Sequence, residues 1–314
     1  MTKLDIQITR RVAATAAVAA VVAAVVGEAV VVAAAEGVAV TDHQELIEVP
    51  LLGIGLRQPV ADWVLSHPPE LDCVEVTAEH FFDSGATVLA QLANHYQVSV
   101  HGLGLSLGTP GPLEESTLRQ FQRVADLTNA RWITEHIAFT KTDDVDLGHL
   151  NPLPMTSGSL TTLADHAREV MDRCQRPLLL ENITSYLRIP GELTEPEFLN
   201  RLCERAGIGL LLDVTNLFIN SQNHDFDPID WLHEVEADFI RQVHIVGYSI
   251  RDGVYHDRHS EPIQNNLYEL LREVVSYAPV EAVILERDVA IPAVNELAGE
   301  LHRLEKTCER ARHS

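Results

Sequence analysis

The sequence is poor in cysteine, and its cysteines lack the spacing of disulfide frameworks and zinc ribbons. Four cysteines occur in 314 residues, and none forms a CxxC pair. They are Cys73, Cys174, Cys203 and Cys308. Such scattered cysteines are typical of reduced thiols in the cytoplasm, because small secreted domains are much denser in cysteine. We therefore predict a cytoplasmic protein whose cysteines are structural.

Basic residues are also scarce, and the sequence contains no cluster of them. Only three of the residues are lysines, and the formal net charge at pH 7 is -23. An acidic protein repels phosphate backbones unless a local basic patch or a bound metal offsets its charge. The composition therefore argues against nucleic acid as a partner. It also offers no lysine suited to the proton shuttle of a sugar isomerase.

The sequence has no uninterrupted apolar run of the length that a membrane span requires. The main candidate is an Ala/Val-rich segment, residues 12–40, which follows Arg10 and Arg11. Glycine and glutamate interrupt it, and its first stretch, residues 12–26, is shorter than the about 20 residues of a membrane-spanning helix. We favour an Ala-rich helix or helical pair that packs on the main domain or on a second subunit of a homodimer. A membrane anchor and a strand-forming arm remain alternatives.

Short apolar runs rich in Val, Ile and Leu repeat eight times from residue 52 onward. Amphipathic segments with apolar residues at every third or fourth position lie between them, as expected for helices that cover a sheet. The runs are LGIGLR (52–57), CVEVTAE (73–79), VSVHGLG (98–104), RWITEHIAF (131–139), PLLLENI (177–183), GLLLDVTN (209–216), QVHIVGY (242–248) and AVILERD (282–288). The clearest amphipathic segments are 115–130, 161–173, 195–205 and 267–278.

This alternation predicts an α/β protein with a (β/α)8 TIM barrel. Buried parallel strands appear as nearly continuous apolar runs, and eight strand–helix units are the number that closes a barrel. An open doubly wound sheet is the alternative, but no GxGxxG motif follows the first run. The glycines of GLGLSLG (102–108) indicate instead a tight loop whose backbone approaches a ligand. We assign residues 1–50 to an Ala/Val-rich N-terminal extension and residues 51–314 to the barrel domain.

Imidazole, carboxylate and amide side chains occupy the C-terminal half of every run from the second onward. In a barrel these strand ends converge on one mouth, so residues far apart in the sequence become neighbours. Burying so many ionisable groups is costly unless metal cations offset their charge. Imidazoles and carboxylates without thiolates suit iron, manganese or zinc. The candidates are Glu79, His101, Glu135, His136, Glu181, Asn182, Asp213, His244, Glu286 and Asp288, with Asp257 and His259 in the predicted loop after the seventh run.

Each of these residues taken alone has a simpler structural explanation. A strand-end carboxylate often caps the following helix, and a single strand histidine is often a core residue. Capping gives no reason for histidines on both the third and the seventh runs, so their joint occurrence favours a metal site. His224, in a polar loop after the sixth run, is left open between surface and mouth. The remaining histidines considered are expected at the surface: His67, His80, His95, His149, His166, His233 and His302.

The motifs also follow the order of a known family. The sequence resembles the multinuclear non-heme iron-dependent oxidative enzymes, typified by the enzyme subunit of methanobactin biosynthesis. Single matching segments are weak signals, whereas nine of them in order, over roughly residues 52 to 290, are a strong one. They are GIGLR, VEVTAEHFF, VSVHGLGLSLG, WITEHIAFT, LLLENI, LLLDVTNLFINSQNHDFD, VHIVGY, YHDRHSEPI and ILERD.

The resemblance implies an oxidoreductase on a xylose-isomerase-like barrel that holds two or three iron ions and uses O2 as co-substrate. It implies that the substrate is a ribosomally synthesised precursor peptide (RiPP precursor), modified at Cys, Asn or Asp, and that a partner protein recognises its leader. The implied metal ligands are His101, Glu135, Asn182, Asp213, His244, Asp257, His259 and Glu286, and Glu79 matches a further acidic position.

We assign catalytic roles to three residues. Glu135 is suited to bridge two metal ions, and Asp257 belongs to the motif after the seventh run. Arg57 at the mouth is suited to orient an anionic group of the substrate by a bidentate contact. For Arg57, a salt bridge with a ligand carboxylate is an equally good explanation.

Two positions depart from the family pattern. The family usually has a histidine ligand shortly after GLR, whereas this sequence reads GLRQPVADW with no histidine before His67. The strand-seven motif usually ends in a second histidine, and Tyr248 occupies that position. The number of irons is therefore left open. A divalent-metal-dependent sugar isomerase or hydrolase is the alternative function, and a non-catalytic metal-binding or peptide-recognition protein is a third, because a barrel does not by itself determine its chemistry.

Overall fold

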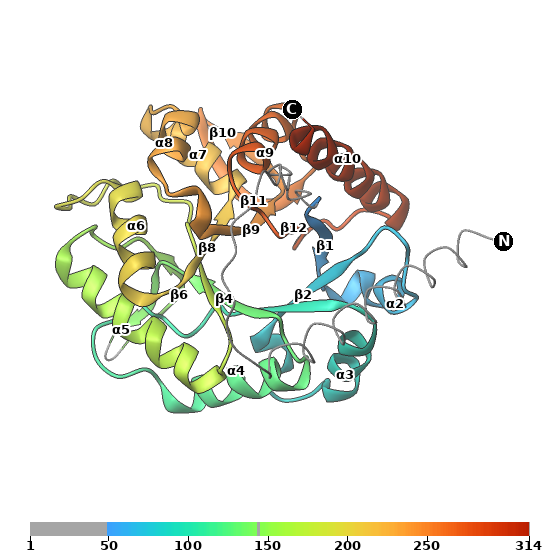
Figure 1. Ribbon diagram of the computed structural model, residues 1–314, viewed down its shortest axis with the longest axis horizontal. Coiled ribbons are helices and arrows are strands. Elements are labelled where there is room, and N and C mark those ends of the chain that lie inside the picture. Colours follow the sequence, from blue (N-terminus) through green and yellow to red (C-terminus); the bar gives the residue numbers. More distant parts are fainter. Residues whose placement is uncertain (1–48, 143–144, 314) are drawn as a thin grey trace, which may run out of the picture. The chain divides into compact units, whose positions relative to one another are not determined.

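Eight parallel strands form a closed barrel in the computed structural model, which describes residues 49–142 and 145–313 (Figure 1). Their order around the barrel is β1-β12-β9-β8-β7-β4-β3-β2. Each strand overlaps one of the eight predicted runs, which confirms the TIM barrel, and β1 pairs with both β12 and β2, which excludes the open sheet. The strands are β1 (Leu51–Gly55), β2 (Cys73–Thr77), β3 (Gln97–His101), β4 (Trp132–His136), β7 (Leu178–Glu181), β8 (Gly209–Asp213), β9 (Ile240–Ile245) and β12 (Ala282–Leu285).

Helices cover the outer face of the barrel (Figure 1). The four amphipathic segments predicted from the sequence correspond to α4, α5, α6 and α9, with ends that differ by a few residues. The helices are α2 (Ala61–Leu65), α3 (Ala86–His95), α4 (Glu115–Leu127), α5 (Ser157–Cys174), α6 (Glu195–Ala206), α7 (Val214–His224), α8 (Pro228–Glu234), α9 (Asn265–Tyr277) and α10 (Val294–Arg312), with short 3-10 turns η1 (Gln58–Val60), η2 (Ala78–Phe81) and η3 (Ala237–Phe239).

The ends and faces of these helices follow from local sequence. Thr194 and Glu197 form a capping box at the start of α6, and Gly207 ends the helix with a positive φ of 71°, a conformation that glycine adopts without strain. On α4, Leu118, Phe121 and Val124 face the barrel and are fully buried. Each such side chain stabilises the fold by about 1.5–3 kcal/mol relative to an exposed one.

Side chains inside the barrel are arranged in an apolar layer below a polar one. The apolar layer is a separate cluster of Cys73, Trp132, Leu179, Leu211, Ala282 and Ile284. Because successive side chains of a strand point to opposite faces, Val74 and Val76 pack outward in the main core while Glu75 points inward. The inward-facing polar positions nearer the C-terminal ends of the strands therefore form the floor of the mouth.

Two antiparallel hairpins extend the chain at the mouth: β5 (Phe139–Thr142) with β6 (Val145–Asn151), and β10 (Gly247–Arg251) with β11 (Val254–Glu261). The prediction that Asp257 and His259 lie in a loop is wrong, because both belong to β11. The sequence of β11 is too polar to look like a strand, and its pairing with β10 decides its conformation.

The Ala/Val-rich segment lies outside the described residues, so the predictions made for it stay predictions. Within the two described ranges, no helix has both the length and the apolar character needed to cross a membrane.

Candidate metal centre

Three overlapping groups of imidazoles and carboxylates meet at the mouth of the barrel. Within each group the candidate ligand atoms lie within 4.8 Å of one another. Glu181 belongs to two groups and Glu286 to two, so the three form one continuous cluster. The groups are His101, His136 and Glu181; Glu181, Asp213, His244 and Glu286; and His259, Glu286 and Asp288.

The strand register explains why these side chains converge. His136 on β4 lies opposite Glu181 on β7, and Asp213 on β8 lies opposite His244 on β9. Since neighbouring parallel strands are about 4.8 Å apart, paired residues that share a face are held within reach of one ion. Five of the predicted ligands belong to these groups, namely His101, Asp213, His244, His259 and Glu286, and a sixth, Asp257, lies 2.9 Å from His259.

Two buried carboxylate oxygens of the cluster, Asp213 Oδ2 in the barrel and Asp257 Oδ1 on β11, have no hydrogen-bond partner. Glu181 Oε2 and His244 Nδ1 have only ion-pair neighbours, the nearest of which are His136 Nε2 at 3.3 Å and Glu286 Oε2 at 3.0 Å, respectively. A buried polar atom without a partner costs free energy, and native proteins seldom leave several of them side by side. Divalent cations bound between these oxygens and nitrogens would satisfy them all. The residues present therefore fit a metal centre.

The charges in the cluster shift its pKa values in opposite directions. Burial would lower the pKa of His244, but the carboxylates of Glu75 and Glu286 outweigh it and raise this pKa well above its usual value. Burial would raise the pKa of Glu286, but His259 and His244 hold it well below the usual range. Burial, with the charge of Glu181 beside it, raises the pKa of Asp213 well above normal. A cation beside Asp213 would offset both effects.

Asp213 is suited to both roles that the sequence suggested for a strand-end carboxylate, which are helix cap and metal ligand. Its Oδ1 accepts a hydrogen bond from the backbone N–H of Asn216 at 2.7 Å and so caps α7. Its Oδ2 is buried and has no partner. One oxygen therefore caps the helix while the other is available to a metal ion.

The β11 residues extend the cluster toward solvent. His259 Nε2 lies 2.9 Å from Asp257 Oδ2, and His259 Nδ1 lies 3.1 Å from Asp288 Oδ2. His259 has a φ of 49°, a left-handed conformation that is rare for residues other than glycine and is often found at functional sites. This conformation places the imidazole between two carboxylates.

Glu135 and Asn182 are predicted ligands whose polar groups are engaged elsewhere in the structure. Glu135 Oε2 accepts from the backbone N–H of Leu105 at 3.0 Å, and Oε1 accepts from that of His136 at 2.9 Å. Asn182 exchanges two hydrogen bonds with the backbone of Asp213, at 3.0 and 2.8 Å. Both residues shape the mouth. Each of their oxygens keeps a second lone pair, so their roles as metal ligands stay predictions.

The backbone of the GLGLSLG loop contacts carboxylate side chains of the chain itself, while its predicted approach to a ligand stays a prediction. Glu79 Oε1 accepts hydrogen bonds from the backbone N–H groups of Leu103 and Gly104, at 2.9 and 2.8 Å. A Cβ at Gly104 would lie 3.2 Å from this same oxygen. The loop therefore holds Glu79 as well as Glu135 by its backbone.

Arg57 and Tyr248, the remaining residues singled out from the sequence, have partners of their own. Arg57 Nη2 lies 2.5 Å from Asp288 Oδ1 and 3.4 Å from Glu286 Oε1, which is the salt bridge with ligand carboxylates named above as the alternative. Tyr248 stacks on Phe218 and its hydroxyl accepts from Asn266 Nδ2 at 3.1 Å. Tyr248 is therefore part of an aromatic contact beside α9.

Sequence reasoning missed Glu75 and Gln242, and it considered His136, Glu181 and Asp288 without choosing them as ligands. Glu75 and Gln242 point into the barrel and are almost fully buried. For Glu75 the available signal was a charged residue in the middle of the strand CVEVT, and for Gln242 it was the spacing of two residues from His244 in IRQVHI, which puts both side chains on one face. For His136, Glu181 and Asp288, the signal was the alternation of side chains along a strand, which decides the residues that point into the barrel as His101 does.

Among the histidines assigned to the surface, the assignment is wrong for His166. It is 7% exposed on α5, and its ring nitrogens lie 2.8 Å from Leu107 O and 2.7 Å from Gly111 O. The helical spacing alone could not reveal that the loop after β3 folds over this face. His224 is half-buried, and its Nε2 lies 2.6 Å from Ser185 O.

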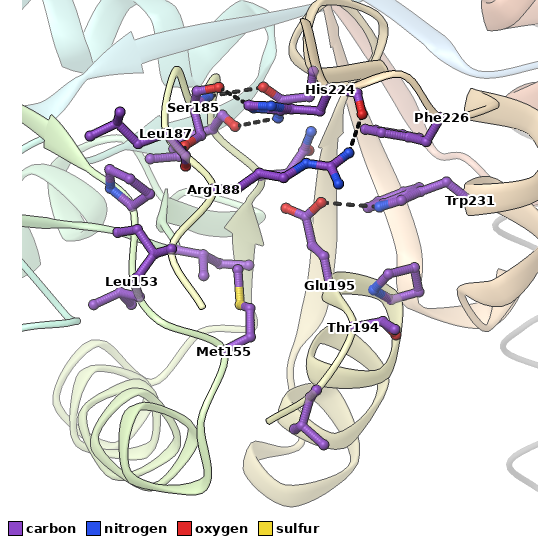
Figure 2. A pocket seen from close by; sticks show the side chains of 18 of the residues that line it. Leu153, Met155, Ser185, Leu187, Arg188, Thr194, Glu195, His224, Phe226 and Trp231 are labelled. Atoms are coloured by element: carbon purple, nitrogen blue, oxygen red, sulfur yellow. Dashed lines mark hydrogen bonds between the residues drawn. The ribbon is translucent and has the colours of Figure 1, made fainter. Parts of the chain in front are cut away.

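Two cavities open side by side at the mouth. The first, of about 530 Å³, is lined by cluster residues such as His101, Asp257 and His259. The second, of about 450 Å³, lies between the loop after β7 and helices α6 and α8. In Figure 2, Leu153 and Met155 face Glu195 and Trp231 across this second cavity. Both cavities share four wall residues, which are Pro152, Ile183, Ser185 and Leu187.

Solved structures with this fold are enzymes of different kinds. Endonuclease IV from Thermus thermophilus is 16% identical with a TM-score of 0.56, and the match covers 83% of this chain and 100% of that one. A proposed xylose isomerase from Rhodospirillum rubrum is 12% identical with a TM-score of 0.54, covering 83% and 99%. At these identities the likeness shows a xylose-isomerase-like barrel and no shared activity.

Sequence relatives are closer. A UPF0276 protein of Chromobacterium violaceum is 36% identical over 251 residues, which cover 79% of this chain and 91% of the relative. The family model described as "RiPP precursor modification enzyme MbnB/TglH/ChrH" matches residues 51–309, the whole of the barrel that carries the cluster. The order of motifs, the closed barrel and this match agree, and the chain belongs to the MbnB/TglH/ChrH family of RiPP precursor modification enzymes.

Proposed function

We propose that the protein is an iron- and O2-dependent oxidase or oxygenase that modifies a ribosomally synthesised precursor peptide at a Cys, Asn or Asp residue. The observation that carries this proposal is the cluster of buried imidazoles and carboxylates at the mouth of a barrel whose family acts on such precursors. Bound iron would supply the activation of O2, which amino-acid side chains cannot perform.

The inward-facing side chains are the proposed metal-binding residues. One ion would be held by His101, His136 and Glu181. A second ion would be held by Asp213, His244 and Glu286 together with Glu181, which belongs to both groups. His259 and Asp288 form a third candidate group near the entrance. Arg57 would hold the Asp288 and Glu286 carboxylates in place rather than bind substrate, since it already pairs with both.

Asp257 is the proposed proton acceptor of the site. Its Oδ2 is held by His259, and its buried Oδ1 lacks a partner and belongs to the wall of the first cavity. A fixed carboxylate with one free oxygen is suited to accept an N–H or S–H proton from a substrate that enters the cavity.

The two adjacent cavities support a peptide as substrate. An extended peptide advances about 3.3 Å per residue, so a chain that crosses the Ser185–Leu187 segment can place one residue at the metal cluster and a neighbour in the second cavity. Leu187, 71% exposed on this segment, offers an apolar surface for such a chain. Recognition of the leader by a partner protein, homodimerisation and a cytoplasmic location belong to the same proposal.

Metal analysis combined with oxygen uptake tests this function. We expect anaerobically purified protein to contain iron, with a Mössbauer spectrum of a multinuclear site, and to consume O2 when given a precursor peptide encoded beside its gene. Protein that retains zinc alone and consumes no O2 with any such peptide would contradict the proposal and favour a hydrolase or isomerase.

Substitutions test the ligand assignment. We expect His244→Ala to lose metal while the circular dichroism spectrum stays that of a folded barrel, because His244 lies in the centre of the cluster. Glu135→Ala and Asn182→Ala provide the comparison. Metal loss in all three supports the full ligand set implied by the family, whereas loss in His244→Ala alone restricts the ligands to inward-facing side chains. Unchanged metal content in His244→Ala would refute the assignment.

A further inference from the structure

A buried polar network lies below the metal cluster and ends on His244. Glu75 Oε1 lies 2.8 Å from His244 Nε2. The other oxygen, Oε2, accepts hydrogen bonds from Gln242 Nε2 at 2.6 Å and from Ser99 Oγ at 3.0 Å. Glu75 and His244 come from β2 and β9, which are not neighbours in the sheet, so this contact crosses the interior of the barrel.

The indole N–H of Trp132 fixes which group donates and which accepts in each hydrogen bond of the network. An indole N–H is only a donor, and Trp132 Nε1 donates to Gln242 Oε1. The amide oxygen of Gln242 therefore faces Trp132, and its NH2 group must face Glu75. With Ser99 also donating, the Glu75 carboxylate is a fixed acceptor.

This acceptor places a proton on Nε2 of His244. A nitrogen lone pair 2.8 Å from a carboxylate oxygen would be repulsive, so Nε2 must carry the hydrogen and donate it. Gln242 Nε2 also lies 3.2 Å from His244 Nε2, but two N–H groups do not bond to each other. Both are directed at the carboxylate between them.

The opposite nitrogen of His244 faces the cluster. Nδ1 lies 3.0 Å from Glu286 Oε2 and 3.6 Å from Glu181 Oε1, so by the same reasoning it also carries a hydrogen in the metal-free protein. A cation that binds Glu286 and Glu181 takes the place of this hydrogen. The Glu75 network keeps the proton on Nε2, so Nδ1 is the nitrogen whose lone pair meets the cation. Carboxylates that fix a ligand histidine in this way recur behind protein metal sites.

We propose that Glu75 is a positioning residue of the metal centre, which keeps His244 protonated at Nε2 and so directs Nδ1 to the metal ion. Trp132 and Gln242 hold Glu75 in its role. The inference rests on the proposed metal site but not on iron or O2, because any divalent ion bound at His244 would meet the same nitrogen.

Zinc binding to the metal-free full-length chain tests the inference, with Zn2+ itself as the probe. We expect Glu75→Gln to weaken zinc binding about 10–100-fold in a chelator competition titration, because an amide has one acceptor oxygen instead of two. Trp132→Phe, which removes the donor that orients Gln242, should weaken it to a smaller extent.

The chain offers a matched control pair. Trp231 Nε1 donates to Glu195 Oε2 at 3.0 Å, the same kind of contact outside the cluster. Glu195→Gln and Trp231→Phe should bind zinc with wild-type affinity. Thermal unfolding followed by circular dichroism identifies variants that are simply unfolded. If Glu75→Gln does not fold, Trp132→Phe against Trp231→Phe still decides the question.

The second readout is the identity of the zinc-bound nitrogen, from a crystal structure or from 15N NMR of labelled histidine. We expect zinc on Nδ1 of His244 and a proton on Nε2. Zinc on Nε2, no zinc on His244, or unchanged affinity in both Glu75→Gln and Trp132→Phe would overturn the inference. The two proposals can fail separately. If zinc binds Nδ1 and Glu75→Gln weakens its binding, but the protein never oxidises a peptide, the inference stands and the proposed oxidative function is rejected.

Discussion

At the residue scale, the pleat of each strand divides adjacent polar residues between two environments. In Glu135-His136 and in Glu181-Asn182, one side chain points into the barrel and joins the cluster, and the other bonds to backbone groups beside it. Neighbours in sequence with similar chemistry therefore have different functions. The inward member of each pair titrates under the influence of the other ionisable groups of the cluster.

Metal uptake should depend on pH through His136. Burial alone would lower its pKa, but the charge of Glu181 and the hydrogen bond of Glu135 raise it to about 9. Its folded-state pKa is thus above the unfolded value of about 6.5, so its ion pairs stabilise the metal-free protein fully below about 6.5 and are lost as the pH rises through about 9. A metal needs the neutral imidazole, so it must displace this proton at pH 7.

We therefore expect the apparent zinc affinity to increase between pH 7 and pH 9, by up to about tenfold per pH unit for each displaced proton. Chelator competition at several pH values measures it, and calorimetry in buffers of different ionisation enthalpy counts the protons. His136→Asn should release fewer protons on binding. An affinity independent of pH would show that His136 is neutral in the metal-free protein.

At the scale of elements, side chains replace backbone contacts where strands end. Asn182 continues the pairing of β7 with β8 by its two bonds to Asp213. His259 ties β11 to the segment after β12, since its Nδ1 lies 3.1 Å from Asp288 Oδ2. His166 does the same for α5 and the loop after β3. Such contacts hold the loops around the mouth.

Replacing His166 should loosen that loop. His166→Ala removes the ring that lies between two backbone carbonyl groups at a buried site, and we expect a loss of about 1–3 kcal/mol in the free energy of unfolding. Urea denaturation followed by circular dichroism measures the change. His302→Ala, on the exposed face of α10, should change the free energy by less than about 0.5 kcal/mol. Equal effects of the two substitutions would contradict a structural role for His166.

At the scale of the whole molecule, the closed barrel gathers ionisable groups in its interior. Ligand candidates from six of the eight strands or their C-terminal ends form one cluster. A metal ion bound there would stabilise the fold, because an ion that binds only the folded state shifts the unfolding equilibrium.

Removing the metal should therefore lower the melting temperature of the whole barrel. At a free metal concentration of about 100 Kd, binding adds about 2.7 kcal/mol of stability, which corresponds to a shift of roughly 5–10 °C for a domain of this size. Calorimetry with and without EDTA measures the shift. His244→Ala should respond much less to the chelator. A melting temperature unaffected by EDTA in the wild-type protein would contradict a bound structural metal.

The sequence by itself determined the barrel, because eight apolar runs separated by amphipathic segments leave little else for the chain to form. It also determined that imidazoles and carboxylates would meet at one mouth, since parallel strands end on the same side. Only the tertiary structure decided which members of that set share a site. Glu75 and Gln242 lie below the mouth in mid-strand, and β11 is a strand only because β10 pairs with it. Contacts across the barrel join residues such as Glu75 and Gln242, which are 167 positions apart, and no local pattern in a sequence records such a distance.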